Sequence, residues 1–156
     1  MNQSLCARFN FGDANIAERL RCIGLTSPVD HEFAEQLQSR VSGPNVDAIV
    51  NEFCGSLRQH AAFREFVSEP SQDERLRATH RQYLLSLGRE FDTPQYFEGR
   101  LQVGSAHQRI GVSLDLYQSF FCLLQTLLIR KIPADIQADT DKFDDLLQFI
   151  LRITSL

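Results

Sequence analysis

The chain has 156 residues, of which 43% are hydrophobic and 23% are charged, and its formal net charge is −4. These values are typical of one folded domain over residues 1–156, and they exclude disordered, collagen-like and low-complexity chains. The 16 basic residues are interleaved with 20 acidic ones instead of forming a block, so nothing predicts nucleic acid as a partner.

Membrane, secretory and metal-finger signals are missing from the sequence. The longest uncharged run, Leu116 to Ile129, is shorter than the roughly 20 apolar residues that a membrane span needs. The N-terminus has no basic stretch followed by an apolar one, so we expect no signal peptide and a cytoplasmic protein. The four cysteines lack Cys-x-x-Cys spacing, which argues against a zinc ribbon or covalently attached haem.

Apolar residues recur every three or four positions through most of the chain, which predicts an all-α protein. In the first half, the clearest stripe follows Pro44 and runs through Val46, Ile49 and Phe53. We expect helices over 15–23, from Ser27-Pro28 to a stop at Ser42-Gly43, from Pro44 to Leu57, and over Ala61 to Val67.

In the second half, Ser71 followed by Glu74 is a capping-box pattern that opens a helix reaching Leu87. The later helices are expected from Thr93-Pro94 to near Gly111, from Ser113 to Lys131 with Pro133 ending it, and from about Asp135 onward.

The histidines are the first candidates for chemistry, because imidazole is a common metal ligand. His31 and His60 lie near helix ends among polar neighbours and receive no role. His80 lies in an apolar stripe, and His107 lies late in its helix; each is either a neutral core histidine bonded to a carbonyl or a ligand. Walker A, G-x-S-x-G and H-E-x-x-H motifs are absent, so we expect no enzyme.

The second half carries a recognisable motif. The run RLQVGSAHQRIGV, Arg100 to Val112, is followed by Tyr117 ten residues after His107. It resembles the proximal motif of the sensor globins of bacterial globin-coupled sensors. The run RLRAT at 75–79 with Tyr83 is similar to their distal helix, Phe53 lies in a match to their second long helix, and 16–25 matches their extra N-terminal helix. The resemblance implies a globin fold.

The resemblance also implies a site for non-covalent haem b. His107 would be the proximal iron ligand, supported by Tyr117, and Leu76 and Thr79 would line the distal side. The other residues that we expect to contact the cofactor are Phe53, Cys54, Tyr83, Val103 and Ile110.

Two positions depart from the family pattern. Cys54 replaces a tyrosine that usually donates a hydrogen bond to bound oxygen, and a thiol is a poor donor. His80 follows the matched Thr79 on the side that should face the haem. The resemblance therefore implies that His80 is a second, distal iron ligand, which gives a bis-histidyl haem.

The function that the resemblance implies is a haem-based sensor of a diatomic gas (O₂, CO or NO) or of redox state. In this family the signal passes to a methyl-accepting, diguanylate cyclase or histidine kinase output domain, and none is recognisable here, so we expect an isolated sensor domain. We also expect a homodimer through the last two helices. Two alternatives stay open: a haem enzyme acting on NO or peroxide, and a haem-free globin-like interaction module.

Overall fold

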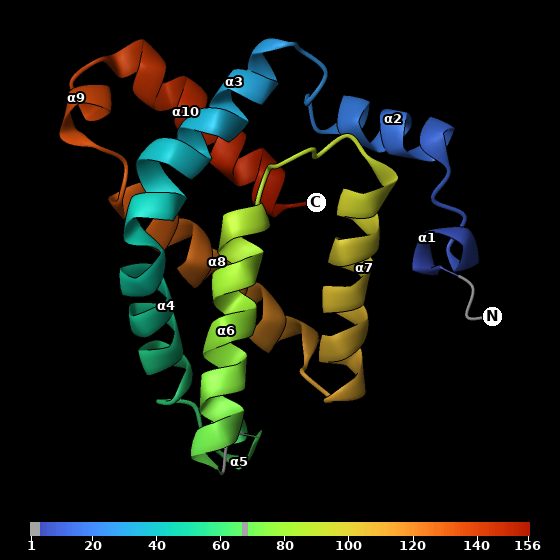
Figure 1. Ribbon diagram of the computed structural model, residues 1–156, viewed down its shortest axis with the longest axis vertical. Helices are drawn as coiled ribbons and strands as arrows, with labels where there is room; N and C mark the ends of the chain where they lie inside the picture. Colours follow the sequence, from blue (N-terminus) through green and yellow to red (C-terminus); the bar gives the residue numbers. More distant parts are fainter. Residues whose placement is uncertain (1–3, 67–68) are drawn as a thin grey trace.

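The computed structural model describes residues 4–66 and 69–156, and Val67, the expected end of one helix, lies outside them. The described residues contain helices and no strand, which confirms the all-α prediction (Figure 1). The helices are α1 Leu5–Arg8, α2 Asp13–Cys22, α3 Val29–Gln36, the π-helical η1 Leu37–Ser42, α4 Gly43–Leu57, α5 Ala61–Phe66, α6 Pro70–Ser86, α7 Pro94–Arg109, α8 Leu114–Arg130, α9 Ala134–Gln137 and α10 Thr140–Thr154.

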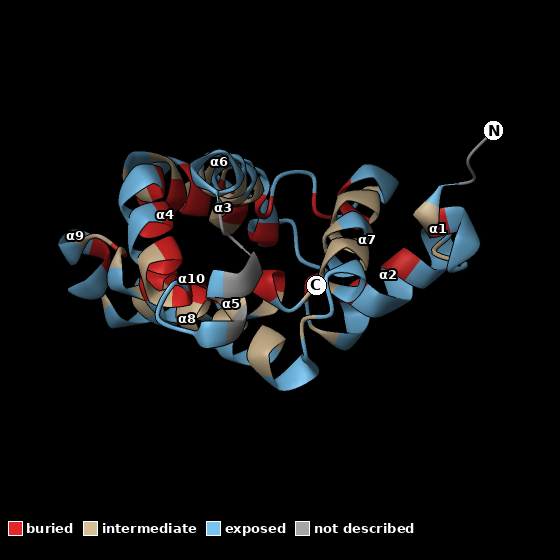
Figure 2. Cartoon of the chain, turned by 90° about the horizontal axis from the view of Figure 1, so that it is seen from below, coloured by how far each residue is buried: buried red, intermediate tan, exposed pale blue. Residues whose placement is uncertain are grey.

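The helices pack in two groups. α4 packs against α6 and α8, and α10 packs against α3 and α8, whereas α7 packs against the N-terminal α1 and α2. Figure 2 shows the buried residues gathered on α3, α4, α8 and α10, with fewer on α7. No helix within the described ranges is both long and apolar enough to cross a membrane.

The predicted break at Ser42-Gly43 is wrong, because the chain stays helical from Val29 to Leu57. η1 widens the helix into π geometry just before Gly43. A Cβ added at Gly43 would lie 2.5 Å from the Gln38 carbonyl oxygen, closer than real Cβ atoms come. The glycine that looked like a stop signal therefore allows the wide turn to continue into α4.

The C-terminal end of α6 is fixed by polar and apolar contacts. The buried Gln38 amide Nε2 donates to the carbonyl oxygens of Leu84 at 3.0 Å and Leu87 at 2.6 Å, at the end of the helix. The next residue, Gly88, has φ +80°, and a Cβ there would lie 3.6 Å from side-chain carbons of Phe149 and Ile153. α6 thus ends against η1 and α10.

α10 is also tied to the N-terminal half of the chain. The Arg152 guanidinium donates to the Gly24 carbonyl oxygen at 3.3 Å, just after α2. Phe149, one turn earlier, packs against Phe33 of α3 with ring centroids 6.1 Å apart. The last turns of α10 therefore contact segments that belong to both groups of helices.

The remaining boundaries differ from the expectations by about one turn. α6 begins at Pro70, because Glu69 and Gln72 form the capping box in place of Ser71 and Glu74. The short α1 carried no apolar pattern and was not expected. The helix expected from Asp135 is two helices, because the Asp139 carboxylate accepts from the Lys142 backbone N–H and starts α10 anew.

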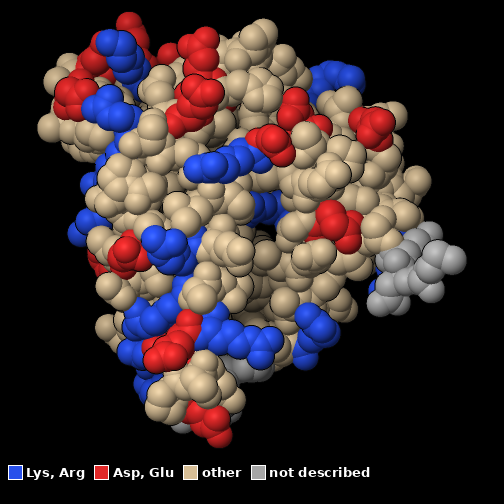
Figure 3. All heavy atoms as spheres, viewed as in Figure 1, with Lys and Arg blue, Asp and Glu red and all other residues tan. Residues whose placement is uncertain are grey.

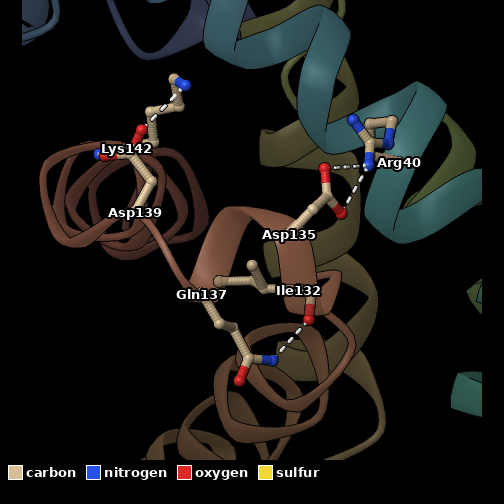
Figure 4. A network of polar contacts seen from close by, with 6 residues as sticks. All are labelled: Arg40, Ile132, Asp135, Gln137, Asp139 and Lys142. Atoms are coloured by element: carbon tan, nitrogen blue, oxygen red, sulfur yellow. Dashed lines mark hydrogen bonds and ion pairs between the residues drawn. The ribbon is translucent and has the colours of Figure 1, made fainter.

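Figure 4 shows how the corner between α8, α9 and α10 is held. Arg40 donates to both carboxylate oxygens of Asp135 at 2.9 and 2.8 Å, which joins η1 to α9. The Gln137 amide donates to the Ile132 carbonyl at 2.6 Å. The Arg40–Asp135 pair is exposed and, like other surface ion pairs, adds little stability, whereas the Gln137 hydrogen bond is partly buried.

The interface between α4 and α6 contains a charged cluster. The Asp73 carboxylate accepts from Arg77 at 2.8 Å and also contacts Arg58, and Arg77 donates to Asn51 of α4 at 2.6 Å. The hydrogen bond from Arg77 is the main cause that lowers the pKa of Asp73. Asp73 is therefore an anion at neutral pH, and the cluster fixes the N-terminal half of α6 to α4.

The role of Gly43 can be tested by Gly43→Ala. We expect the added methyl group to lower the free energy of unfolding by about 1–3 kcal/mol, because the carbonyl it meets belongs to the backbone and cannot move freely. Gly55→Ala in the same helix is the control, since a Cβ there meets nothing within 4 Å and should stabilise by up to about 1 kcal/mol. Urea unfolding measures both; equal effects of the two substitutions would refute the role of Gly43.

Candidate functional site

α6 and α7 stand side by side without packing closely on each other. The structure describes both helices over their whole length. α6 packs mainly against α4, and α7 packs against α1 and α2. Figure 3 shows the surface hollowed between α6 and α7. Among the apolar, aromatic and imidazole side chains that are half-buried on α6, α7 and α8 are Leu76, His80, Tyr83, Leu101, Val103, His107, Tyr117, Phe120 and Phe121.

His80 lies on the α6 side of this space. Its Nδ1 is 3.0 Å from the Leu76 carbonyl oxygen, and its ring meets the Phe53 ring edge-on with centroids 5.0 Å apart. A carbonyl oxygen can only accept, so Nδ1 carries the hydrogen and Nε2 keeps a free lone pair. Burial lowers the pKa of His80, which keeps the ring neutral at physiological pH.

His107 lies on the α7 side and has the same arrangement. Its Nδ1 is 2.8 Å from the Val103 carbonyl oxygen, and its ring packs edge-on against Tyr117 of α8 at 5.0 Å. His80 and His107 thus each have Nδ1 held by a carbonyl of their own helix, which leaves Nε2 to act as a ligand, as a metal-bound histidine requires.

The structure brings together most of the site residues expected from the sequence. Leu76 and Val103 supply the two carbonyls, Phe53 packs on His80, and Tyr117 packs on His107. Tyr83 lies one turn beyond His80 and is half-buried.

Three expected residues lie apart from the histidines. Thr79 is exposed, and its hydroxyl donates to the Arg75 carbonyl at 2.9 Å. Ile110 follows the end of α7 and is 43% exposed.

Cys54, the third, is fully buried, and burial raises the pKa of its thiol. The charges that act on it are those of Arg77, Asp73 and Arg58, which belong to the cluster between α4 and α6. Its neighbour Phe53, not the thiol, contacts His80.

Arg100 is the site residue whose role the sequence did not predict. Its guanidinium lies over the Tyr83 ring at 4.2 Å and the Tyr96 ring at 4.5 Å, between α6 and α7. One terminal nitrogen, Nη2, donates to the Ser86 hydroxyl at 3.0 Å, while Nε and Nη1 are buried without a hydrogen-bond partner. The signal in the sequence was its place in the motif, seven residues before His107.

Aromatic residues of α8 close the inner side of the site. Phe120 meets the rings of Phe53 at 6.4 Å and His60 at 5.3 Å, and Phe121 packs against Tyr117 at 5.3 Å. Phe120 and Phe121 were expected only as part of the apolar stripe, because periodicity does not distinguish a core side chain from a pocket wall. His60, which received no role, contacts this wall but is exposed.

Two surface pockets lie elsewhere, with volumes of about 410 and 520 Å³. The first is formed mainly by the segment 9–23 and the end of the chain, and the second by α2, the loop that follows it and Asp92. The second contains His31, whose Nε2 lies 3.5 Å from Asp92. Neither contains His80 or His107.

The arrangement between α6 and α7 fits haem. The described residues contain no group of three or more histidine, cysteine or acidic side chains able to hold a metal ion. Porphyrin supplies four nitrogens to its iron, and the protein adds one or two imidazoles of the kind found here. The walls are apolar, as a porphyrin face requires, and the unpartnered guanidinium nitrogens of Arg100 suit the acidic edge of the ring.

Comparison with known proteins gives two matches. Residues 12–156 match a protein-family model described as Protoglobin. The chain is also 29% identical over 138 residues to the heme-based aerotactic transducer HemAT of Halobacterium salinarum. That alignment covers 87% of this chain but 28% of the transducer, so the chain spans less than a third of that relative's length.

Proposed function

Because the chain belongs to the protoglobin family, we propose that it binds haem b between α6 and α7 and forms the sensing part of a signalling protein. Membership confirms the globin fold and the resemblance to sensor globins expected from the motif, and haem b is the cofactor of globin sensors of this kind. The observation that carries the proposal is a pair of imidazoles, one on α6 and one on α7, each with its Nδ1 hydrogen-bonded to a carbonyl of its own helix.

Haem iron, when bound, supplies the atom at which O₂, CO or NO is held. In the proposal, His107 is the permanent protein ligand. The Val103 carbonyl fixes its tautomer, and the Tyr117 ring limits its rotation, so Nε2 is oriented before the cofactor arrives. A ligand whose orientation is already fixed loses little entropy on binding.

His80 is proposed as the displaceable distal ligand. It is anchored like His107, and Phe53 supports its ring. A gas must compete with His80, so its apparent affinity falls with the fraction of time that the distal side is free. The buried Cys54 thiol is a poor donor to bound oxygen. Affinity for gas would therefore be governed by release of His80.

One observation favours sensing over catalysis: the relative is named as a transducer. We propose that the signal is a diatomic gas or the iron redox state, and that a cytoplasmic output domain receives it. Turnover of NO or peroxide with a supplied electron donor would instead show an enzyme. Absence of a Soret band after haem is offered would show a haem-free interaction module.

We also propose a homodimer through α8 and α10, which pack against each other. Leu116 and Leu123 of α8 are half-buried, and Leu151 of α10 is 40% exposed. We expect sedimentation at micromolar concentration to give a dimer, and Leu151→Glu to shift it toward monomer. Val29→Glu on α3 is the control, since Val29 is also 40% exposed. A monomeric wild type would contradict the dimer.

His107→Ala should remove most of the haem. The substitution deletes the proposed proximal Nε2 and leaves a cavity beside Tyr117, so the ratio of Soret to protein absorbance after purification should fall severalfold or more. His31→Ala is the control, because His31 is exposed and lies outside this space. Full haem occupancy with an unchanged spectrum in His107→Ala would show that another residue holds the iron.

His80→Leu should convert a low-spin, six-coordinate ferrous spectrum into a high-spin, five-coordinate one and should speed CO binding. Leucine fills the volume but cannot ligate, so the distal side becomes free. His60→Leu is the control, since His60 contacts Phe120 from an exposed position. If ferrous wild type is already five-coordinate, His80 is a structural histidine.

A further inference from the structure

Arg100 has buried hydrogen-bond donors that the protein does not satisfy. Nε and Nη1 are buried and have no acceptor, while the guanidinium is sandwiched between the Tyr83 and Tyr96 rings. Aromatic faces attract a cation but do not accept N–H bonds as an oxygen does. A buried cation with unmet donors is costly unless a negative group pairs with it.

The protein supplies no such group among the described residues. Among the side chains that the structure describes, which exclude that of Glu65, none forms an ion pair with Arg100. Its hydrogen-bond partners are the neutral hydroxyls of Ser86 and Tyr83. Glu98, the nearest acid along α7, accepts from the backbone N–H groups of Leu5 and Cys6 instead. The described side chains therefore leave Nε and Nη1 of Arg100 without an acceptor.

Arg100 is placed to meet a ligand held by His107. Both lie on α7, and seven residues separate their Cα atoms by roughly 10 Å along the helix axis. The charge of Arg100 also acts on the hydroxyl of Tyr117, whose ring packs against His107. Through Nη2 it reaches Ser86, which is exposed, so the guanidinium extends from the inner site toward solvent.

We propose that the free N–H groups of Arg100 donate to a propionate carboxylate of haem. The proposal rests on haem binding between α6 and α7 and adds the residue that holds its acidic edge. A haem bound through its iron alone could turn about the His107 bond, and an arginine–carboxylate pair would fix one orientation of the ring. Arg100 is thus a positioning residue, joined to α6 through Tyr83 and Ser86.

The test compares haem with haem dimethyl ester, in which both carboxylates are neutral. Each is loaded into wild type and Arg100→Leu, and release is followed as transfer to excess apomyoglobin. We expect Arg100→Leu to release haem about tenfold faster or more, the effect of losing one charge-assisted hydrogen bond. It should release the ester at nearly the wild-type rate. Arg81→Leu, an exposed residue that pairs with Asp47, should change neither rate.

Each outcome separates the proposals. Equal acceleration of haem and ester by Arg100→Leu would mean that Arg100 only holds α6 to α7, and no acceleration of either would mean that the propionates lie elsewhere; both results overturn the inference. Wild type that takes up neither porphyrin would instead overturn the proposed haem binding. If Arg100→Leu fails to fold, Arg100→Lys replaces it, because lysine keeps the charge but lacks the paired N–H groups of the guanidinium. Arg100→Lys must then release haem, but not the ester, faster than wild type. Any other result overturns the inference.

Discussion

α6, which carries His80, and α7, which carries His107, are held by different neighbours. α6 is fixed to α4 by the Asp73 cluster and to η1 by Gln38, whereas α7 packs on α1 and α2. If the two helices packed directly on each other, side chains would fill the space between them at core density. Because α6 and α7 pack against other helices, they leave a slot between them, the site described above, whose walls are apolar and half-buried.

The slot orients imidazoles before any metal is present. Each ring donates its Nδ1–H to a carbonyl oxygen one turn earlier in its own helix, at 3.0 Å for His80 and 2.8 Å for His107. No other side chain is needed to set the tautomer. The aromatic neighbours then differ: Phe53 presents only hydrocarbon to His80, while Tyr117 brings a hydroxyl to the side of His107. Two histidines with the same local geometry thus acquire unequal surroundings, consistent with one permanent and one exchangeable ligand.

The sequence was informative where one local pattern decides a structure. The Thr93-Pro94 and Ser113 starts are confirmed. The Thr93 hydroxyl caps α7 by accepting from the Tyr96 backbone N–H, and a periodic apolar stripe follows both starts. The π turn was not predictable, since Ser42-Gly43 reads as a stop unless the distant Leu84 and Leu87 carbonyls are known to hold Gln38 in place. Likewise, periodicity placed His80 on the inner face, but the contact with Phe53 and the unpaired donors of Arg100 depend on tertiary packing.

The close contact of Gly88 with α10 connects the site to the C-terminal helix. The end of α6 lies directly on Phe149 and Ile153, and the turn after α2, the helix that packs on α7, is bonded to Arg152. The last two turns of α10 therefore contact both the end of α6 and the turn that follows α2. A change in the distance between α6 and α7 would therefore act on the last two turns of α10 through two separate contacts.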